Sequence, residues 1–410
     1  MSAGARPGAP TAPVEIHGQC DPRFAAVREA FAENFAARGD VGAAVSITID
    51  NAAVVDLWGG FADGARQRPW ERDTVANVMS TTKGVTALAA LMLVERGQLD
   101  LDAPVARYWP EFGQAGKLAI PVRWLLSHRA GVPGWRAKLS TEALFDWRRA
   151  TDPLAASEPW WEPGTQHGYH ALTYGQLVGE VIRRVSGQSV GAFVRKEIAG
   201  PLGAEFSIGV PAGQEKQVAE ILPDPPPAPG EVPLAMRLMA DPTSHGARVF
   251  SNPGLRPGTA NTPEWRAAEL PAANGHTTAR GLARIYGALA AGGQREGVHL
   301  LRPETLLLAL QEQSRGRDAV LSFTTRFGLG FMLTLPDPPR GEDGFAPFGA
   351  GPRGFGHPGR GGSIGFGDPA SRLGFGYVMN QYQTGTPGAR DRRWASLAAA
   401  AYAALGVRAS

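Results

Sequence analysis

Residues 74–105 read TVANVMSTTKGVTALAALMLVERGQLDLDAPV, and this stretch places a chemically distinctive pair at the start of an apolar segment. The apolar run predicts a buried helix over 80–96 that ends at Gly97. Ser80 and Lys83 form an S-x-x-K pattern, and residues three apart share one helix face. A lysine buried in such a helix has a lowered pKa and can take a proton from a serine. The stretch predicts Ser80 as a nucleophile and Lys83 as its base. The alternative is a helix-capping serine beside a lysine that reaches solvent.

A glycine-rich stretch near the end of the chain, GFGHPGRGGSIGFG at 354–367, contains two further patterns. The first, G-x-G-x-x-G at 354–359, matches the dinucleotide fingerprint, but no helix can begin after it and strand-like runs flank it. The second, G-x-S-x-G around Ser363, matches the nucleophile elbow. That arrangement needs a histidine later in the chain, and the last histidine is His357. The stretch therefore needs another explanation.

Two more stretches share the character of an active site: LLSHRAGVPGW at 125–135, and WWEPGTQHGYHALTYGQLVGEVI at 160–182 with Tyr169 inside it. Together with 74–105 and with HPG at 357–359, they resemble the serine β-lactamase and penicillin-binding-protein family. Within it, the order and spacing of the boxes are most similar to class C β-lactamases and family VIII carboxylesterases. The resemblance covers nearly the whole chain, from residue 22 to residue 405.

The resemblance implies a role for each box. Tyr169 would carry a proton between Ser80, Lys83 and the leaving group, and the neighbouring lysine should lower the pKa of its phenol. The HPG box would lie on a strand that lines the site, where its glycine lets the strand pass close to a bound substrate. The backbone N–H of Arg360 would join that of Ser80, at the positive end of its helix, as the oxyanion hole.

The order of predicted elements indicates an α/β (α+β) fold, and the resemblance implies that it is of the β-lactamase/transpeptidase type. A helix at 21–38 is followed by a hairpin over 41–60, and the chain ends with strand-like runs between 327 and 380 and a helix at 392–406. Strands so close in sequence favour antiparallel pairing. We therefore expect an antiparallel sheet flanked by helices, made of residues 21–97 and 271–410. Residues 98–270 would be an inserted helical domain that walls the substrate pocket, and 1–20 a flexible segment.

The composition excludes several other functions. The net charge is +3 with no basic run, so we expect no nucleic-acid partner. The sequence contains no run of the roughly 18 apolar residues that a membrane span needs, so we expect no contact with a membrane. The single cysteine excludes an intramolecular disulfide, and no apolar signal segment is recognised at the N-terminus, so a cytoplasmic location is expected. The scattered histidines offer no metal site, so we expect no metal and no cofactor. The oligomeric state is not predicted.

Two departures from the lactamase pattern favour a neutral ester as the substrate. Where class C enzymes have Tyr-x-Asn, this chain has Tyr169-His170-Ala171, which lacks the amide that helps to hold a β-lactam side chain. Where they have a lysine in the third box, this chain has His357, which is mostly neutral at pH 7. The prediction is a serine carboxylesterase acting on small to medium esters. An acyltransferase or a β-lactamase of the same superfamily stays open, as does a non-catalytic binding relative.

Aromatic and polar residues near the boxes are candidates for substrate contacts. Each could equally be a core residue, and Asn274 could cap the following helix. The predicted substrate-binding residues are His357, Gly359, Trp135, Trp160, Trp161, Phe327, Asn274 and His276.

Overall fold

The computed structural model describes residues 13–227, 230, 232–336, 348, 353–384 and 391–407. Its strands are β1 (Ile16–Cys20), β2 (Gly42–Ile49), β3 (Ala52–Gly60), β4 (Ala76–Asn77), β5 (Phe206–Ile208), β6 (Gly275–Thr277), β7 (Gln294–Arg295), β8 (Val298–His299), β9 (Ser314–Arg317), β10 (Thr324–Phe327), β11 (Met332–Leu333), β12 (Phe355–Pro358), β13 (Ile364–Asp368) and β14 (Leu373–Met379).

Its α-helices are α1 (Ala25–Ala37), α2 (Thr82–Glu95), α3 (Val122–Leu126), α4 (Thr141–Phe145), α5 (Trp147–Ala156), α6 (Thr173–Ser186), α7 (Val190–Val194), α8 (Gly200–Leu202), α9 (Leu234–Met239), α10 (His245–Ser251), α11 (Pro263–Ala267), α12 (Ala279–Ala290), α13 (Pro303–Ala309) and α14 (Arg392–Ala404).

The main sheet is antiparallel throughout, as the short links between strands predicted. In the described part of the chain its order is β1-β3-β2-β14-β13-β12-β11-β10-β9. The N-terminal hairpin thus pairs with the C-terminal strands, because β2 lies beside β14. The hairpin turns at Asp50 and Asn51, whose φ angles are both positive, +49° and +66°, as a two-residue turn of this kind requires.

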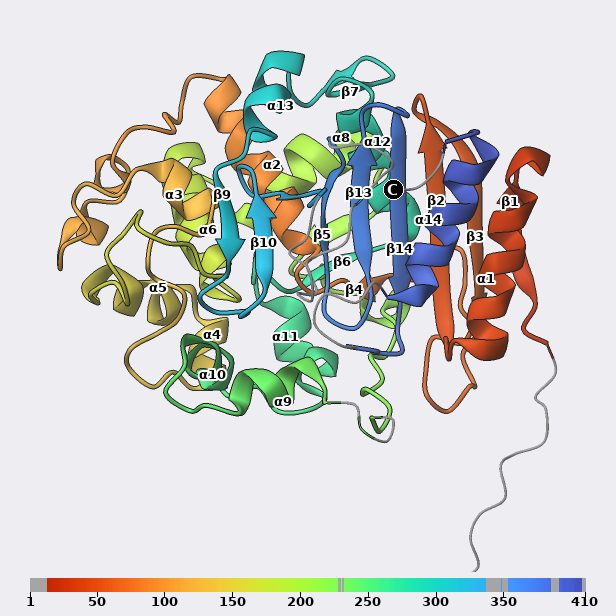
Figure 1. Cartoon of the computed structure of the whole chain (residues 1–410), viewed down its shortest axis with the longest axis horizontal. Helices are drawn as coiled ribbons and strands as arrows, with labels where there is room; N and C mark the ends of the chain where they lie inside the picture. The colour runs from red at the N-terminus through yellow and green to blue at the C-terminus, as the bar shows by residue number, and fades with distance from the viewer. Residues whose placement is uncertain are drawn as a thin grey trace, which may run out of the picture.

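Helices cover both faces of this sheet (Figure 1). Helices α1 and α14 pack against each other, and α12 packs across β2, β13 and β14. The predicted fold class, an antiparallel sheet flanked by helices, is confirmed. Residues 98–270 contain α3 to α11, and their one described strand, β5, joins β4 and β6 in a small separate sheet.

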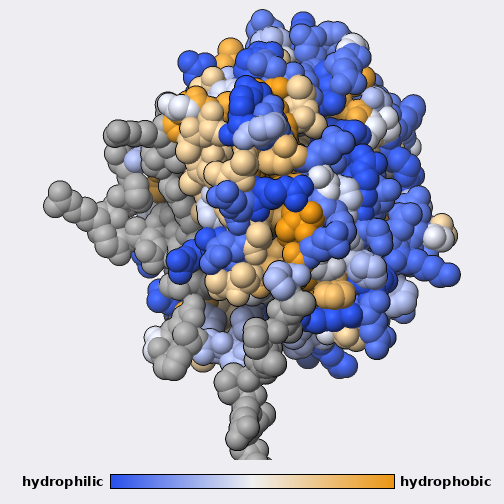
Figure 2. Space-filling model, turned by 90° about the vertical axis from the view of Figure 1, so that its right-hand side faces the viewer, coloured by the Kyte–Doolittle hydropathy of each residue, from blue (hydrophilic) through white to orange (hydrophobic). Residues whose placement is uncertain are grey.

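The N-terminal segment differs from the prediction of a flexible stretch over 1–20. Residues 16–20 form β1, which pairs in full with β3. Arg28 on α1 fastens this strand by donating to the carbonyls of Ile16 and Gly18, at 2.9 and 3.0 Å. The rest of that prediction, residues 1–12, lies outside the described residues. Figure 2 shows this side of the molecule, where hydrophilic residues surround a smaller apolar area.

Helix α2 is the central element for the site. All its residues from Thr82 to Leu93 are buried, and the helix packs against α6, α7, α13 and β12. The predicted helix over 80–96 is confirmed, but it begins at Thr82, so that Ser80 lies in the turn before it. The packing of α2 on β12 brings the S-x-x-K segment beside the HPG box, although the two are far apart in sequence.

Candidate active site

Ser80 lies on a tight turn that leads into α2. Within this turn the backbone N–H of Thr81 donates to the carbonyl of Val78 at 3.1 Å. Met79, directly before the serine, has a φ of +44°, a left-handed conformation that is uncommon for a residue with a side chain. Such strain is retained when the surroundings enforce it, and it clusters at functional sites.

Lys83 is completely buried, and its amine has three hydrogen-bond partners. Its Nζ atom lies 3.2 Å from Oγ of Ser80, 2.8 Å from the carbonyl oxygen of Ala171 and 2.9 Å from that of Ala272. Burial holds the pKa of the amine well below its usual value. A neutral amine has two N–H donors and one lone pair. The two carbonyls can only accept, so they take both donors, and the lone pair is left for the hydroxyl of Ser80.

Tyr169 completes the predicted trio. Its phenol forms a hydrogen bond with Ser80, and Nζ of Lys83 lies 4.7 Å from the centre of its ring. The expectation that Lys83 would lower the pKa of this tyrosine is wrong: burial raises it, and the bond to Ser80 only partly offsets that effect. Because Lys83 is held neutral, it supplies little positive charge to favour a phenolate. Tyr169 is therefore a phenol that keeps its proton.

Asp318, which the sequence did not single out, fixes the backbone of Tyr169. The Oδ1 atom of this fully buried carboxylate accepts from the backbone N–H of Tyr169 at 3.0 Å and from those of Val320 and Leu321 at 2.8 Å. Burial raises the pKa of Asp318, and the nearby His167 and these N–H donors oppose that rise. The only available signal was an aspartate in a loop, which does not reveal its partners.

A group of uncharged aromatic side chains holds the ring of Tyr169. Phe327 stacks on it, with planes 17° apart and centroids 6.4 Å apart, and His128 lies 5.1 Å from it. Burial lowers the pKa of His128 well below its usual value and that of His170 to about 3. These imidazoles are neutral, so they pack beside Lys83 without adding charge.

His357 is neutral as well, as the sequence predicted. Burial lowers its pKa to about 3. Its Nδ1 donates to the carbonyl of Pro358 at 2.8 Å, so the proton is on Nδ1 and the Nε2 atom is an acceptor. Nε2 is buried and has no partner among the described residues. The centres of the His357 and Tyr169 rings are 6.0 Å apart, so the HPG box and the tyrosine box do meet.

Gly359 makes a close approach, but to the protein and not to an open pocket. A Cβ atom here would lie 2.2 Å from the carbonyl oxygen of Val78, 2.2 Å from Oγ of Ser363 and 3.0 Å from Oγ1 of Thr81. The glycine therefore lets the strand end press against the Ser80 turn. Ser363 donates to the carbonyl of Val78 at 2.9 Å, so this serine is a structural brace and not a second nucleophile.

The two predicted oxyanion donors are both available. Within the described parts of the chain, no acceptor takes a hydrogen bond from the backbone N–H of Ser80 or of Arg360. Arg360 follows Gly359, whose contacts place it against the turn that carries Ser80. The side chain of Arg360 points elsewhere, toward Asp224 at 3.6 Å and the ring of Tyr382.

The other predicted contact residues divide into two groups. Trp160 and Trp161 are partly exposed and pack against the apolar cluster that contains Tyr169, and their indole N–H groups find no partner among the described residues. Trp135 is in the core and donates to the carbonyl of Ala150 at 2.8 Å. Phe327 is fully buried behind Tyr169. The structure therefore places Trp135 and Phe327 among the core residues.

Asn274 and His276 are also buried. The backbone of Asn274 forms a bridge with Met79, next to Ser80, but its side-chain amide bonds to the backbone of Trp265, Ala268 and Leu270. It does not cap α12 either, because Thr278 does. His276 lies in β6 between β4 and β5, and burial lowers its pKa to about 3.

The described residues show neither a metal-binding cluster nor a membrane-spanning helix. They contain no group of three or more His, Cys, Asp or Glu side chains that could hold a metal ion. None of the helices among them is both long and apolar enough to cross a bilayer.

An antiparallel sheet with a buried Ser-x-x-Lys pair facing a tyrosine defines a serine hydrolase of the β-lactamase and penicillin-binding-protein class. The chain belongs to the Beta-lactamase family, whose profile matches residues 27–400, so the resemblance seen in the sequence is confirmed.

Among curated proteins, the chain is 38% identical to the Esterase/beta-lactamase LipL of Mycobacterium tuberculosis over 91% of this chain and 84% of that protein. It is similar to a crystal structure of a family VIII carboxylesterase, with 40% identity, a TM-score of 0.84 and coverage of 95% of this chain and 100% of the other. A penicillin-binding-protein homologue from Caulobacter crescentus matches with the same identity, coverage and TM-score.

Proposed function

We propose that the chain is a serine carboxylesterase in which Ser80 is the nucleophile and Lys83 and Tyr169 move its proton. The observation that carries this proposal is the hydrogen bonding of Lys83, whose two N–H donors in the neutral form both have acceptors. Two backbone carbonyls take the N–H donors of the neutral amine, which directs its lone pair at Oγ of Ser80. A serine is a weak nucleophile until a neighbouring base is placed to receive its proton.

In the first half-reaction, Oγ of Ser80 attacks the ester carbonyl as its proton passes to Lys83. The electron pair of the C=O bond moves to oxygen, and the backbone N–H groups of Ser80 and Arg360 stabilise that charge. When the intermediate collapses, the C–O bond to the alcohol breaks. The alkoxide takes the phenolic proton of Tyr169, and the ammonium of Lys83 restores it. The products are a free alcohol and an acyl-Ser80.

In the second half-reaction, water attacks the acyl-Ser80. Its proton passes to the same neutral pair, and Oγ of Ser80 leaves with a proton returned from it. The carboxylic acid is released and Lys83 is neutral again. The chemistry needs no group beyond these side chains and the two backbone donors.

Three features support an ester over an anionic β-lactam. His357 offers no positive charge to a substrate carboxylate. Ala171 has no side-chain amide, and its carbonyl is engaged with Lys83. Trp160 and Trp161 offer apolar surface beside Tyr169 for an acyl or alkyl group. We further propose that residues 98–270 wall this pocket as an inserted domain. The free thiol of Cys20, the only cysteine, supports a reducing compartment such as the cytoplasm.

The test compares the wild type with Ser80→Ala on p-nitrophenyl acetate, butyrate and octanoate, with a chromogenic cephalosporin alongside. Ser46→Ala is the matched control, because Ser46 is also buried but donates to the carbonyl of Val55 within the sheet. Ester hydrolysis that is lost only in Ser80→Ala supports the proposal. Unchanged hydrolysis in Ser80→Ala would refute it. Rapid cephalosporin turnover with inert esters would move the enzyme to the β-lactamase branch, to which the name of LipL also points.

A further inference from the structure

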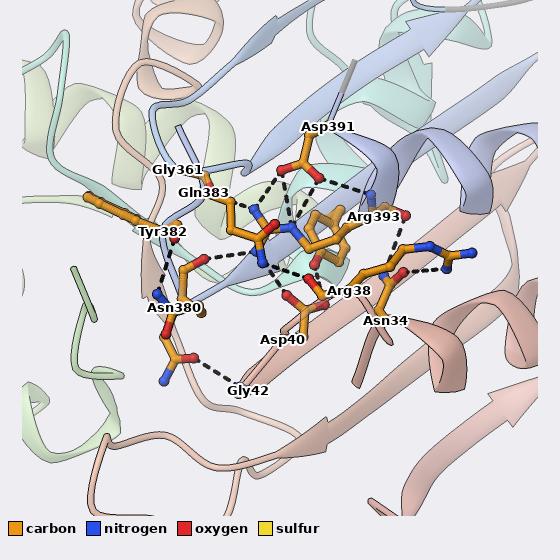
Figure 3. A network of polar contacts seen from close by, with 12 residues as sticks. Asn34, Arg38, Asp40, Gly42, Gly361, Asn380, Tyr382, Gln383, Asp391 and Arg393 are labelled. Atoms are coloured by element: carbon orange, nitrogen blue, oxygen red, sulfur yellow. Dashed lines mark hydrogen bonds and ion pairs between the residues drawn. The ribbon is translucent and has the colours of Figure 1, made fainter. Parts of the chain in front are cut away.

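A completely buried arginine lies behind the turn that carries the second oxyanion donor (Figure 3). Arg393, on α14, has five N–H donors, and all five are used. Its Nε donates to Asp391 at 3.0 Å, and Nη2 donates to Asp391 and to the carbonyl oxygen of Gly361, both at 2.6 Å. Its Nη1 donates to Asp40 at 3.0 Å and to the carbonyl of Gln381 at 2.8 Å.

The turn over residues 359–362 is held at several points. The N–H of Gly362 donates to the carbonyl of Gly359 at 3.1 Å, and Gly361 has a φ of +88°, an arrangement typical of a type II turn. Arg360 is the second residue of this turn, and its N–H points to no acceptor among the described residues. The carbonyl of Gly361, two peptides further on, accepts from Arg393 and also from the N–H of Gln383 at 3.1 Å.

The space around the turn leaves it little freedom to move. A Cβ atom at Gly361 would lie 2.1 Å from the ring of Tyr382. One at Gly362 would lie 2.2 Å from Nη2 of Arg393 and 2.3 Å from a carboxylate oxygen of Asp391. The Nη2 end of the guanidinium thus lies directly against the backbone of the turn, and its position limits where the turn can lie.

We propose that Arg393 is a positioning residue for the oxyanion hole: by holding the carbonyl of Gly361, it fixes the direction of the backbone N–H of Arg360. This inference rests on the proposed function, because it assumes that Arg360 donates to the oxyanion. It adds that a side chain on the last helix controls how well that donor is aimed. Donors of this kind stabilise a transition state only when they are already in place.

The arginine is in turn fixed by elements from distant parts of the chain. Asp40, just beyond α1, is fully buried and also accepts from the hydroxyl of Tyr377 on β14 at 2.5 Å. The side-chain amide of Asn34 on α1 donates to the carbonyl of Arg393 at 3.4 Å. A planar guanidinium can reach two carboxylates and two carbonyls at once, whereas a lysine has only three donors on one nitrogen. The geometry therefore demands arginine.

The experiment compares Arg393→Lys and Arg393→Met with the wild type on p-nitrophenyl butyrate, with butylboronic acid as a tetrahedral inhibitor. Arg280→Met is the matched control, because Arg280 on α12 is a buried arginine paired with Asp56 on β3 and with Asp73 in the loop before β4. In both Arg393 variants we expect kcat to fall about tenfold or more, with KM within about twofold, because an oxyanion donor is no longer aimed. The inhibition constant of the boronic acid should rise in parallel. Arg280→Met should lower the melting temperature and leave kcat unchanged.

Two outcomes would overturn the inference. In the first, folded Arg393 variants keep the wild-type kcat. In the second, Arg280→Met loses as much kcat as the Arg393 variants do for the same fall in melting temperature. If both Arg393 variants fail to fold, Asp391→Asn replaces them. It keeps a good N-cap for α14 but weakens the hold on Arg393, so a smaller fall in kcat at constant KM is expected and an unchanged kcat refutes the proposal. A wild type that is inert on esters, or activity that survives Ser80→Ala, would instead refute the proposed function itself.

Discussion

The Nζ atom of Lys83 lies 3.2 Å from Oγ of Ser80, and no carboxylate is among its three hydrogen-bond partners. Buried lysines usually have a negative partner that keeps them charged. Here backbone carbonyls of two separate segments take that place, at Ala171 beside the tyrosine box and at Ala272 before β6. Burial without a carboxylate partner lowers the pKa of Lys83 and so favours the neutral amine, which is the form that can accept a proton from the serine.

Activity should depend on pH through Lys83. The burial that lowers its pKa favours the neutral amine, and protonation at lower pH removes the base. We therefore expect kcat/KM to fall on the acid side as pH drops through the lowered pKa. No loss from ionisation of Tyr169 should appear on the alkaline side below about pH 10, because its pKa is raised from the usual value near 10.

The substitution that tests this is Lys83→Arg, because a guanidinium stays protonated. It should reduce kcat/KM by about 10²–10⁴, the usual range for loss of a general base. A pH–rate profile of p-nitrophenyl butyrate hydrolysis measures both effects. Wild-type activity that stays level into strongly acidic solution would contradict Lys83 as the base whose protonation stops the reaction.

Lys83 should also make the free energy of unfolding depend on pH. The unfolded chain binds a proton at Lys83 below about pH 10.4, whereas the folded chain does not bind it until the lowered pKa is reached. Between these values, each drop of one pH unit should destabilise the folded state by about 1.4 kcal/mol at this position. The folded pKa of a lysine is lowered here, so stability rises with pH across that window.

Lys83→Met removes this pH-dependent destabilisation, although it leaves the carbonyls of Ala171 and Ala272 without their donor. Its free energy of unfolding, relative to the wild type, should therefore increase by about 1.4 kcal/mol for each unit of acidification below about pH 10. Urea unfolding at several pH values measures this difference. A difference that does not vary with pH would mean that Lys83 is charged in the folded state.

The sequence predicted the elements whose pattern is local. An apolar stripe of Phe24, Val27, Phe31 and Phe35 predicted the first helix, and the β-rich runs on either side of Asp50-Asn51 predicted the hairpin. The three boxes were also found, because each joins a reactive residue to a recognisable turn or helix. Substrate contacts were harder to predict, because the sequence around Trp135, Phe327 and Asn274 would look the same whether these residues lined a pocket or lay in the core.

Contacts that join distant segments could not be read from the sequence. The strand β1 was missed because a short run with a central Gly18 looks like a loop until β3 is beside it. The raised pKa of Tyr169 was missed because it comes from burial, which depends on how distant segments pack around the tyrosine. Each of these is a property of packing between segments, not of a motif.

Gly359→Ala should disturb the active site by displacing the turn that carries Ser80. Its Cβ would lie 2.2 Å from the carbonyl of Val78, which cannot yield without moving the Ser80 turn. We expect kcat/KM to fall at least about 100-fold, in the range for loss of an oxyanion donor. Gly367→Ala, on β13, is the control, since its Cβ would approach only to 3.0 Å. Equal activity in the two variants would show that the turn is not held by this contact.

Asp318→Ala should separate positioning of Tyr169 from general stability. It leaves the N–H groups of Tyr169, Val320 and Leu321 without their shared acceptor, and each buried unpaired donor costs about 1–3 kcal/mol. We expect a lower melting temperature together with at least about a tenfold fall in kcat, because the phenol loses its place beside Ser80.

The matched control for Asp318 is Asp368→Ala. Asp368 is also fully buried and accepts from the backbone N–H of Ala370 and the hydroxyl of Tyr402, at the other end of β13 from the site. This variant should lose stability and keep its kcat. Asp318→Asn should recover part of the activity, because its amide oxygen can still accept from the N–H of Tyr169. If Asp318→Ala and Asp368→Ala lose stability alike and both keep their kcat, Asp318 serves the fold and does not position the tyrosine.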